Sequence, residues 1–135
     1  MNCFWCSMQR RKELNEYAAR NGYTHLALGH HLDDVLETFL MNALNKGTLE
    51  TMPPAMQYEK YPVKIIRPLY YVPVSEIITH SESEGWKSQT CTCTYQDNSG
   101  RKDVRRRLDL LTNGDNAQKK RLLLALKNIK TDYLP

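Results

Sequence analysis

The chain has 135 residues, of which 41% are hydrophobic and 25% are charged. This composition suits one globular domain that can bury a core without disulfides, and it excludes disordered tails and small disulfide-held secreted proteins. No apolar run reaches the roughly 18 residues of a membrane span. Because the chain has only four cysteines and no segment resembling an export signal, we expect a cytoplasmic protein with reduced thiols and no membrane partner.

The first 47 residues are predicted to form a helix, a strand and a second helix. The first helix begins at an N-cap, Ser7, and continues to Asn21, since the six residues before it are too few to form an element. A short buried strand is expected over 24–28. The second helix ends at Gly47 and carries the clearest periodicity. Spacings of three and four place these residues on one buried stripe: Leu32, Val35, Leu36, Phe39, Leu40, Ala43 and Leu44.

The rest of the chain is predicted to add one strand and three helices. Residues 48–62 are expected to form an irregular loop, and residues 63–67 form a strand that Pro68 closes. A helix follows from about Pro73 and ends by Gly85. The last two helices are separated by a turn at residues 113–115. Their apolar positions are Val104, Leu108 and Leu111 on one, and Leu122, Leu126, Ile129 and Tyr133 on the other.

Alternating helices and strands predict an α/β fold with a parallel sheet and C-terminal helices. Two strands are too few for a doubly wound sheet, so we expect a partial sheet. A partner chain or a second copy can complete it at the unpaired edge. Residues 1–98 form the α/β part with a net charge of −2, and residues 99–135 form a basic helical region with a net charge of +6. The basic region predicts either a polyanion partner or a solvated helical surface.

The turn after the first strand predicts a ligand site, because ligands bind at the carboxyl ends of parallel strands, next to helix N-termini. Gly29 permits close approach, His30 and His31 can donate to phosphate oxygens, and Asp33 can hold Mg²⁺ or handle a proton. A solvated loop is the alternative. The motif Asp34-Val-Leu-Glu37 also fits a capping box, with Asp34 as N-cap and Glu37 at the third helical position.

The four cysteines form a C-x-x-C at Cys3 and Cys6 and a C-x-C at Cys91 and Cys93. Four thiolates can hold zinc, whereas three can hold an iron–sulfur cluster with one open iron. Arg10-Arg11, about one helical turn after Cys6, would balance the negative charge of such a site. Unrelated buried thiols and a redox pair are the alternatives.

The penultimate helix carries a basic stripe. Five basic residues lie within two helical turns: Arg101, Lys102, Arg105, Arg106 and Arg107. Such a stripe neutralises an RNA phosphate backbone without reading its sequence. The alternative is that the stripe forms the ion pairs Asp103–Arg107 and Arg105–Asp109 on a solvated helix.

Taken together, these motifs resemble the PP-loop ATPases that thiolate tRNA, most closely the tRNA 2-thiocytidine synthetase type. The resemblance rests on Cys3-x-x-Cys6-Ser7 with Arg10-Arg11, the run from Ala27 to Thr38, Met52-Pro53-Pro54, Ile66-Arg67-Pro68-Leu69, the Cys91/Cys93 segment with Gln96 and Asn98, and Asn128 with Tyr133-Leu134. It implies a Rossmann-like fold of the adenine nucleotide alpha hydrolase type. It also implies that ATP with Mg²⁺ adenylates the C2 oxygen of a pyrimidine in tRNA. Sulfur from a donor, carried on a [4Fe–4S] cluster, then displaces AMP.

The resemblance also assigns roles to residues. It implies that Cys3 and Cys6 bind the cluster with a third cysteine, Cys91, for which Cys93 is a rival because the family spacing there is usually C-x-x-C. Asp33 matches the acid beside the reacting carbonyl, and Arg10 matches a basic residue near cluster and substrate.

One element of the family is missing from this sequence, namely the phosphate-binding loop Ser-Gly-Gly-x-Asp-Ser. That loop cradles the ATP phosphates, so we expect the chain to be the C-terminal half of such an enzyme and not to turn over ATP alone. Two alternatives stay open: a non-catalytic Cys₄ zinc module with an RNA-binding basic helix, and an ATP-pyrophosphatase relative acting on another substrate.

Overall fold

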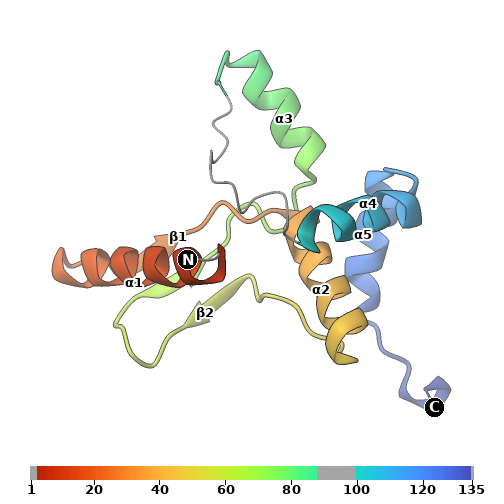
Figure 1. Ribbon diagram of the computed structural model, residues 1–135, viewed down its shortest axis with the longest axis horizontal. Helices are drawn as coiled ribbons and strands as arrows, with labels where there is room; N and C mark the ends of the chain where they lie inside the picture. The colour runs from red at the N-terminus through yellow and green to blue at the C-terminus, as the bar shows by residue number, and fades with distance from the viewer. Residues whose placement is uncertain (1–2, 88–99, 135) are drawn as a thin grey trace.

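The computed structural model describes residues 3–87 and 100–134, without the side chains of Cys3 and Phe4. Its elements in chain order are α1 (Cys3–Arg20), β1 (His25–Ala27), α2 (Leu32–Lys46), β2 (Ala55–Gln57), β3 (Lys64–Ile66), α3 (Val74–Ser83), α4 (Gly100–Thr112), α5 (Asn116–Ala125) and a short 3₁₀ helix, η2 (Thr131–Tyr133). The α/β class expected from the sequence is confirmed (Figure 1). Within these residues, no helix combines the length and the apolar character that crossing a membrane requires.

The described chain contains a small sheet with the strand order β1-β3-β2. Strands β1 and β3 are parallel, with Leu26 opposite Ile65, as the helical connection between them predicts. Strand β2 is antiparallel to β3 and places Met56 opposite Ile65. The expectation of an irregular loop over 48–62 is therefore wrong at β2. Three residues directly after two prolines give no alternating pattern, and the strand depends on hydrogen bonds from β3.

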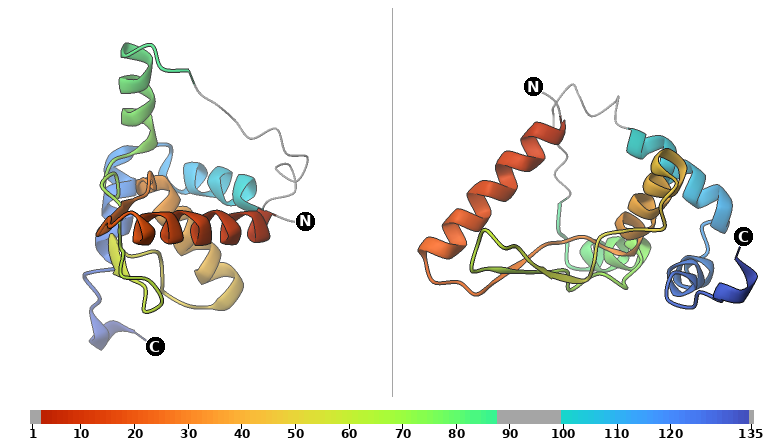
Figure 2. Two further views of the ribbon diagram at one scale, coloured as in Figure 1. Left: turned by 90° about the vertical axis from the view of Figure 1, so that its left-hand side faces the viewer. Right: turned by 90° about the horizontal axis from the view of Figure 1, so that it is seen from below.

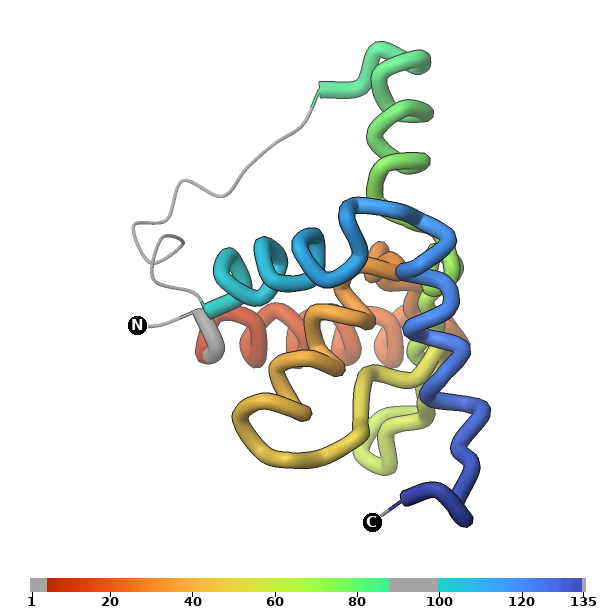
Figure 3. The backbone as a smooth tube through the Cα atoms, turned by 90° about the vertical axis from the view of Figure 1, so that its right-hand side faces the viewer, coloured from red at the N-terminus to blue at the C-terminus, as the bar shows by residue number. Residues whose placement is uncertain are grey.

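The core of the described chain is built around α2, which packs against α4 and α5. Six buried residues from these helices and the loop after β3 form one cluster: Leu32, Val35, Leu36, Tyr70, Leu108 and Leu123. The apolar stripe predicted for α2 is confirmed at its N-terminal part, since its first members and Phe39 are buried. Figure 3 shows α4 and α5 wrapped around α2.

Two helix boundaries differ from expectation. Helix α1 already begins at Cys3, so the first cysteine pair lies within its first two turns and Ser7 is not its N-cap. Helix α5 ends at Ala125, although the apolar spacing predicted a helix as far as Tyr133. The Asn128 N–H is shared by the carbonyls of Leu124 and Ala125, which tightens and closes the last turn. Tyr133 is 85% exposed, so no buried contact extends the helix to it.

The arrangement of the elements brings distant parts of the chain together. Helix α3 projects away from the remaining elements and buries none of its own residues (Figure 1). The N-terminal ends of α1 and α4 lie on the same side of the molecule and face each other across a gap in the right-hand view (Figure 2). The boundary expected at residue 98 lies outside the described residues, and α4, which follows it, packs directly on α2.

Candidate functional site

The candidate site is the turn from β1 to α2, residues 28–31, together with the helix ends that surround it. The backbone N–H of Leu28 extends the parallel pairing by donating to Ile66 O at 2.9 Å, and the Leu32 N–H donates to Val72 O at 3.0 Å. These bonds fix both ends of the turn at the carboxyl edge of the sheet. The N-terminal ends of α1 and α4 approach one another on this side of the molecule (Figures 2 and 3).

A capping box closes the N-terminus of α2, one turn earlier than the sequence suggested. His31 is the N-cap, and its Nδ1 accepts from the Asp34 N–H at 3.4 Å. In return, the His31 N–H donates to Asp34 Oδ2 at 3.2 Å. The expectation that Asp34 is the N-cap and Glu37 its partner is therefore wrong. Asp34 occupies the third helical position, and Glu37 is left for another contact.

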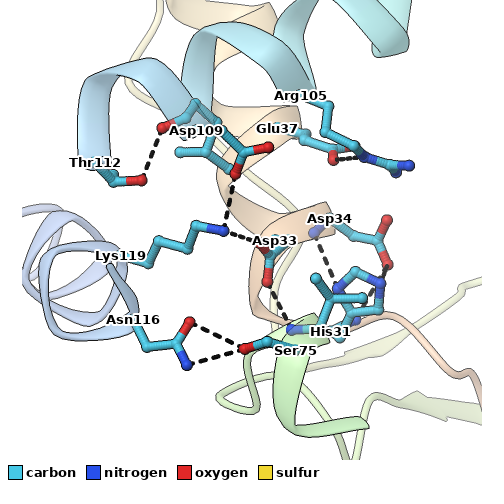
Figure 4. Close-up of polar contacts among 12 residues, drawn as sticks. His31, Asp33, Asp34, Glu37, Ser75, Arg105, Asp109, Thr112, Asn116 and Lys119 are labelled. Carbon is cyan, nitrogen blue, oxygen red and sulfur yellow. Dashed lines mark hydrogen bonds and ion pairs between the residues drawn. The ribbon is translucent and has the colours of Figure 1, made fainter. Parts of the chain in front are cut away.

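Asp33 is held in a buried polar network rather than facing an open site (Figure 4). Its Oδ1 accepts a hydrogen bond from Lys119 Nζ at 2.6 Å, and its Oδ2 accepts from the Val74 N–H at 2.8 Å. Lys119 also donates to Asp109 Oδ1 at 3.1 Å. The network ties together the N-termini of α2 and α3 and the helices α4 and α5. The Asp33 side chain is 5% exposed, whereas that of Asp34 is 17% exposed, so Asp34 is the more accessible of the two acids in the first turn of α2.

The network favours the charged forms of both partners. Burial alone would raise the pKa of Asp33, but the hydrogen bonds from Lys119 and the Val74 N–H, with the Lys119 charge, lower that pKa below its ordinary value. Burial would likewise lower the pKa of Lys119, and hydrogen bonds to Asp33 and Asp109 raise that pKa instead. The ion pair is therefore fully charged at neutral pH.

A second ion pair joins α2 to α4. Arg105 Nε donates to Glu37 Oε1 at 2.6 Å, and its Nη2 lies 3.4 Å from Oε2. The Glu37 side chain is completely buried, while that of Arg105 is 60% exposed. The pair Arg105–Asp109 expected along α4 is thus replaced by a contact to another helix, and Asp109 pairs with Lys119.

The other basic residues of α4 are exposed. The expected Asp103–Arg107 pair is confirmed at 2.7 Å, and Arg106 also contacts Asp103 at 2.9 Å. Hydrogen bonding by Arg106 lowers the pKa of Asp103 below its usual range. Arg101 and Lys102 lie in the first turn of α4 and are exposed, and the charge of Arg101 acts on His30.

Several cations surround His30. Burial lowers the pKa of His30, and the charges of Arg67, Arg11 and Arg101 lower it further, against an opposing effect of Asp34. The His30 ring is therefore neutral at pH 7, and its Nδ1 is buried without a partner among the described residues. Arg67 is buried at the end of β3, where its Nη1 donates to Pro53 O at 2.5 Å and its Nε likewise has no described partner. Positive charge thus converges on the turn from α1, β3 and α4.

Gly29 and Arg10 complete the set of residues predicted for the site. Gly29 is exposed and has no positive φ, and a Cβ built on it would meet nothing within 4 Å. The described chain therefore leaves open space in front of this backbone. Arg10 is exposed on α1, one turn after Cys6.

The predicted metal ligands are only partly visible. Cys6 is an exposed free thiol, and Cys3 begins the same helix three residues earlier, a spacing that places the two backbone positions on one helical face. Cys91 and Cys93 lie outside the described residues. Among the residues that are described, no group of three or more His, Cys, Asp or Glu side chains gathers to hold a metal ion. The exposed thiol at a helix start fits one ligand of a thiolate-bound centre, since a helix N-terminus favours negative charge.

Sequence reasoning missed Lys119 and the true partner of Glu37. The signal for Lys119 was available, because it lies four residues before the buried Leu123 and so falls on the inward stripe of α5. A lysine at such a position requires a buried acid. Nothing in the sequence identifies which acid, since Asp33 is 86 residues away.

The chain is similar in sequence to proteins of one known family. The sequence model of the PP-loop domain family matches residues 8–110. The tRNA-cytidine(32) 2-sulfurtransferase of Legionella pneumophila (strain Corby) is 35% identical over 133 residues, covering 98% of this chain and 47% of that protein. The protein of the same name from Citrifermentans bemidjiense is 36% identical over 134 residues, covering 98% of this chain and 52% of that protein.

A solved structure gives the same result for the fold. The U34-tRNA thiolase NcsA from Methanococcus maripaludis, with its [4Fe–4S] cluster, matches 96% of this chain and 46% of its own, with a TM-score of 0.73 and 29% sequence identity. The chain therefore spans about half the length of the relatives that it matches.

Proposed function

Since the chain belongs to the PP-loop domain family, we propose that it carries the sulfur-transfer site of an ATP-dependent tRNA-thiolating enzyme. The observation that carries the proposal is the placement of the first cysteine pair. The start of α1, which holds Cys3 and Cys6, approaches the start of α4 on the side where Arg11, Arg67 and Arg101 act on His30 of the turn. Relatives named tRNA-cytidine(32) 2-sulfurtransferase and a neighbour that contains a [4Fe–4S] cluster support it.

Cys3, Cys6 and one cysteine of the second pair are the proposed cluster ligands. Cys91 is our choice for the third, with Cys93 as its rival. When bound, such a cluster with one open iron supplies the position at which sulfur is held for transfer. Arg10, exposed on α1 one turn after Cys6, supplies positive charge near this centre.

The residues of the turn are proposed to hold the substrate. Gly29 leaves its backbone accessible, and His30 and His31 line the approach to ATP phosphates and tRNA. Asp33, our sequence-based candidate for the acid beside the reacting carbonyl, is tied to Lys119 and Val74. These contacts support a role in fixing the turn, and the greater exposure of Asp34 supports this neighbour as the acid nearest the substrate. The rate of tRNA thiolation, measured for Asp33→Asn and for Asp34→Asn in an active thiolating enzyme, separates these two roles.

The basic face at the start of α4 is proposed to contact the tRNA backbone through Arg101, Lys102 and Arg106. Arg105 contributes less, because Glu37 already neutralises it. ATP phosphates require a Gly-rich loop that this sequence does not contain, so we expect no AMP release from ATP by this chain alone.

Cysteine replacement tests the proposal, with iron and acid-labile sulfide measured after anaerobic purification. A cluster held by three cysteines predicts that Cys3→Ser, Cys6→Ser and Cys91→Ser each abolish iron binding, while Cys93→Ser retains it. If Cys91→Ser retains iron and Cys93→Ser loses it, Cys93 is the third ligand in place of Cys91, and the proposal is otherwise unchanged. One zinc per chain, lowered by all four replacements, would instead indicate a Cys₄ zinc module and would overturn it.

A further inference from the structure

A hollow of about 600 Å³ lies between α1 and the loop that joins β2 to β3. On the α1 side it is lined by Met8, Arg11, Lys12 and Asn15, and on the loop side by residues 57–61. Its size falls within the range of ligand pockets.

Asn15 contains an unused acceptor at this hollow. The residue is only 2% exposed, and its Nδ2 donates to Arg11 O at 2.8 Å. Its Oδ1 is buried and has no hydrogen-bond partner in the described chain. A buried carbonyl without a donor is costly. Because Asn15 is one of the residues that line the hollow, a ligand that binds there and brings an N–H group can satisfy this acceptor.

The opposite wall is aromatic and held in shape. Tyr58 and Tyr61 line the hollow and are half-buried. Gln57 Nε2 donates to Tyr61 O at 2.8 Å and to Val63 O at 3.2 Å, which closes the loop on itself. Two tyrosines on a braced loop are suited to stacking against a planar ring.

The rim is positively charged. Arg11, Lys12 and Lys60 line the hollow, opposed there by Glu59 alone among its acidic residues. Arg11 also acts electrostatically on His30 and on Arg67, so one side chain connects the hollow with the cation-rich turn. A ligand with a planar ring, an N–H donor and a negative charge satisfies all three features.

We propose that this hollow binds a nucleobase together with its phosphate, and that the source is an unstacked nucleotide of an RNA strand. Tyr58 and Tyr61 stack on the base, Asn15 Oδ1 accepts from one of its N–H groups, and Arg11 and Lys60 neutralise the phosphate. A fatty acid or another apolar anion lacks the donor that Asn15 requires. The assignment of RNA rests on the proposed function, since a free nucleotide has the same chemistry.

The test measures binding of a fluorescent four-nucleotide RNA to the 135-residue chain, alongside the same sugar–phosphate strand with abasic sites and alongside AMP. We expect the abasic strand to bind about tenfold more weakly, because base stacking on an aromatic ring contributes on the order of 1–3 kcal/mol. Tyr58→Ala and Asn15→Leu should each reduce binding of the complete strand and leave binding of the abasic strand unchanged. Tyr133→Ala, which alters an exposed tyrosine far along the chain from the hollow, is the matched control.

Equal binding of the complete and the abasic strand would overturn the proposal, because charge alone would then explain the affinity. AMP that binds as tightly as the four-nucleotide strand would assign the site to a free nucleotide and overturn the RNA source. Folding of each variant is checked by circular dichroism, and Gln57→Glu, which repels the carbonyls that brace the loop, gives an independent second disruption. Cluster content is measured on the same samples, so a failure of the thiolation proposal is distinguishable from a failure at the hollow.

Discussion

The two halves of the described chain are stabilised differently. Helices α2, α4 and α5 share one apolar cluster, and two buried carboxylates, Asp33 and Glu37, are each paired with a cation from another helix. Helix α1 instead contacts chiefly β1, buries only Asn15 and Ala18 among its described side chains, and leaves an acceptor unpaired. Helices α2, α4 and α5, the ionic half, are fixed by contacts with one another. Helix α1, the α1 half, instead retains an unpaired acceptor that another molecule can use.

Removing Lys119 should have the largest effect on this contrast. Lys119→Ala leaves Asp33 buried, charged and without its main partner, so we expect the free energy of unfolding to fall by about 3–5 kcal/mol. Chemical denaturation monitored by circular dichroism measures it. Lys120→Ala is the matched control, because Lys120 pairs with Glu76 at an exposed position and such pairs contribute about 0–1 kcal/mol.

A double replacement shows whether the charge itself is responsible. In Lys119→Met with Asp33→Asn, neither residue leaves an unpaired charge, and the amide still offers an acceptor to the Val74 N–H. We expect this protein to be more stable than Lys119→Ala. If it is instead the less stable of the two, the unpaired charge of Asp33 is not what destabilises Lys119→Ala, and the assignment to charge pairing is overturned.

Replacing Arg105 and Arg106 one at a time should distinguish an arginine of α4 that stabilises the fold from one that contacts RNA. Arg105→Ala strands the buried Glu37 carboxylate, and we expect a loss of about 2–3 kcal/mol, less than for Lys119 because Arg105 is largely exposed. Arg106→Ala, on the exposed face of α4, should leave the melting temperature nearly unchanged and weaken tRNA binding, with a smaller dependence on salt. A melting temperature lowered equally by both replacements would show that the two arginines do not differ in this way.

The Asp33 network should also give a pH dependence. The pKa of Asp33 is lowered in the folded chain, so its stabilising contribution is complete above the ordinary value of about 3.9 and is lost as the pH falls through the folded value. Lys119, whose pKa is raised, contributes below about pH 10.4 and loses its contribution as the pH rises further. Melting temperatures between pH 6 and pH 2 should fall more steeply for the wild-type chain than for Asp33→Asn. Parallel curves would assign the acid sensitivity to other carboxylates.

The contrast between the halves also explains what the sequence could predict. The stripe of α2 follows from spacing within one helix, and the resemblance to tRNA-thiolating PP-loop proteins follows from motifs that remain in order along the chain. The partners of Asp33 and Glu37 lie 86 and 68 residues away, and no local pattern selects them. The sequence does not predict His31 as an N-cap, because histidine is an uncommon residue at that position, and β2 exists only because β3 pairs with it.

The smallest expected effect lies in the α1 half, at Asn15. Asn15→Leu loses the bond from Nδ2 to Arg11 O but also removes the unpaired Oδ1 and places a better helix former within α1. These effects oppose one another, so we expect the free energy of unfolding to change by less than about 1 kcal/mol. Thermal denaturation of both proteins without RNA measures it. A loss above 2 kcal/mol would mean that Asn15 stabilises the fold through a contact in the unliganded chain. An unchanged stability combined with weaker RNA binding would instead show that the unpaired acceptor serves a ligand, which is the property that distinguishes this half from the ionic one.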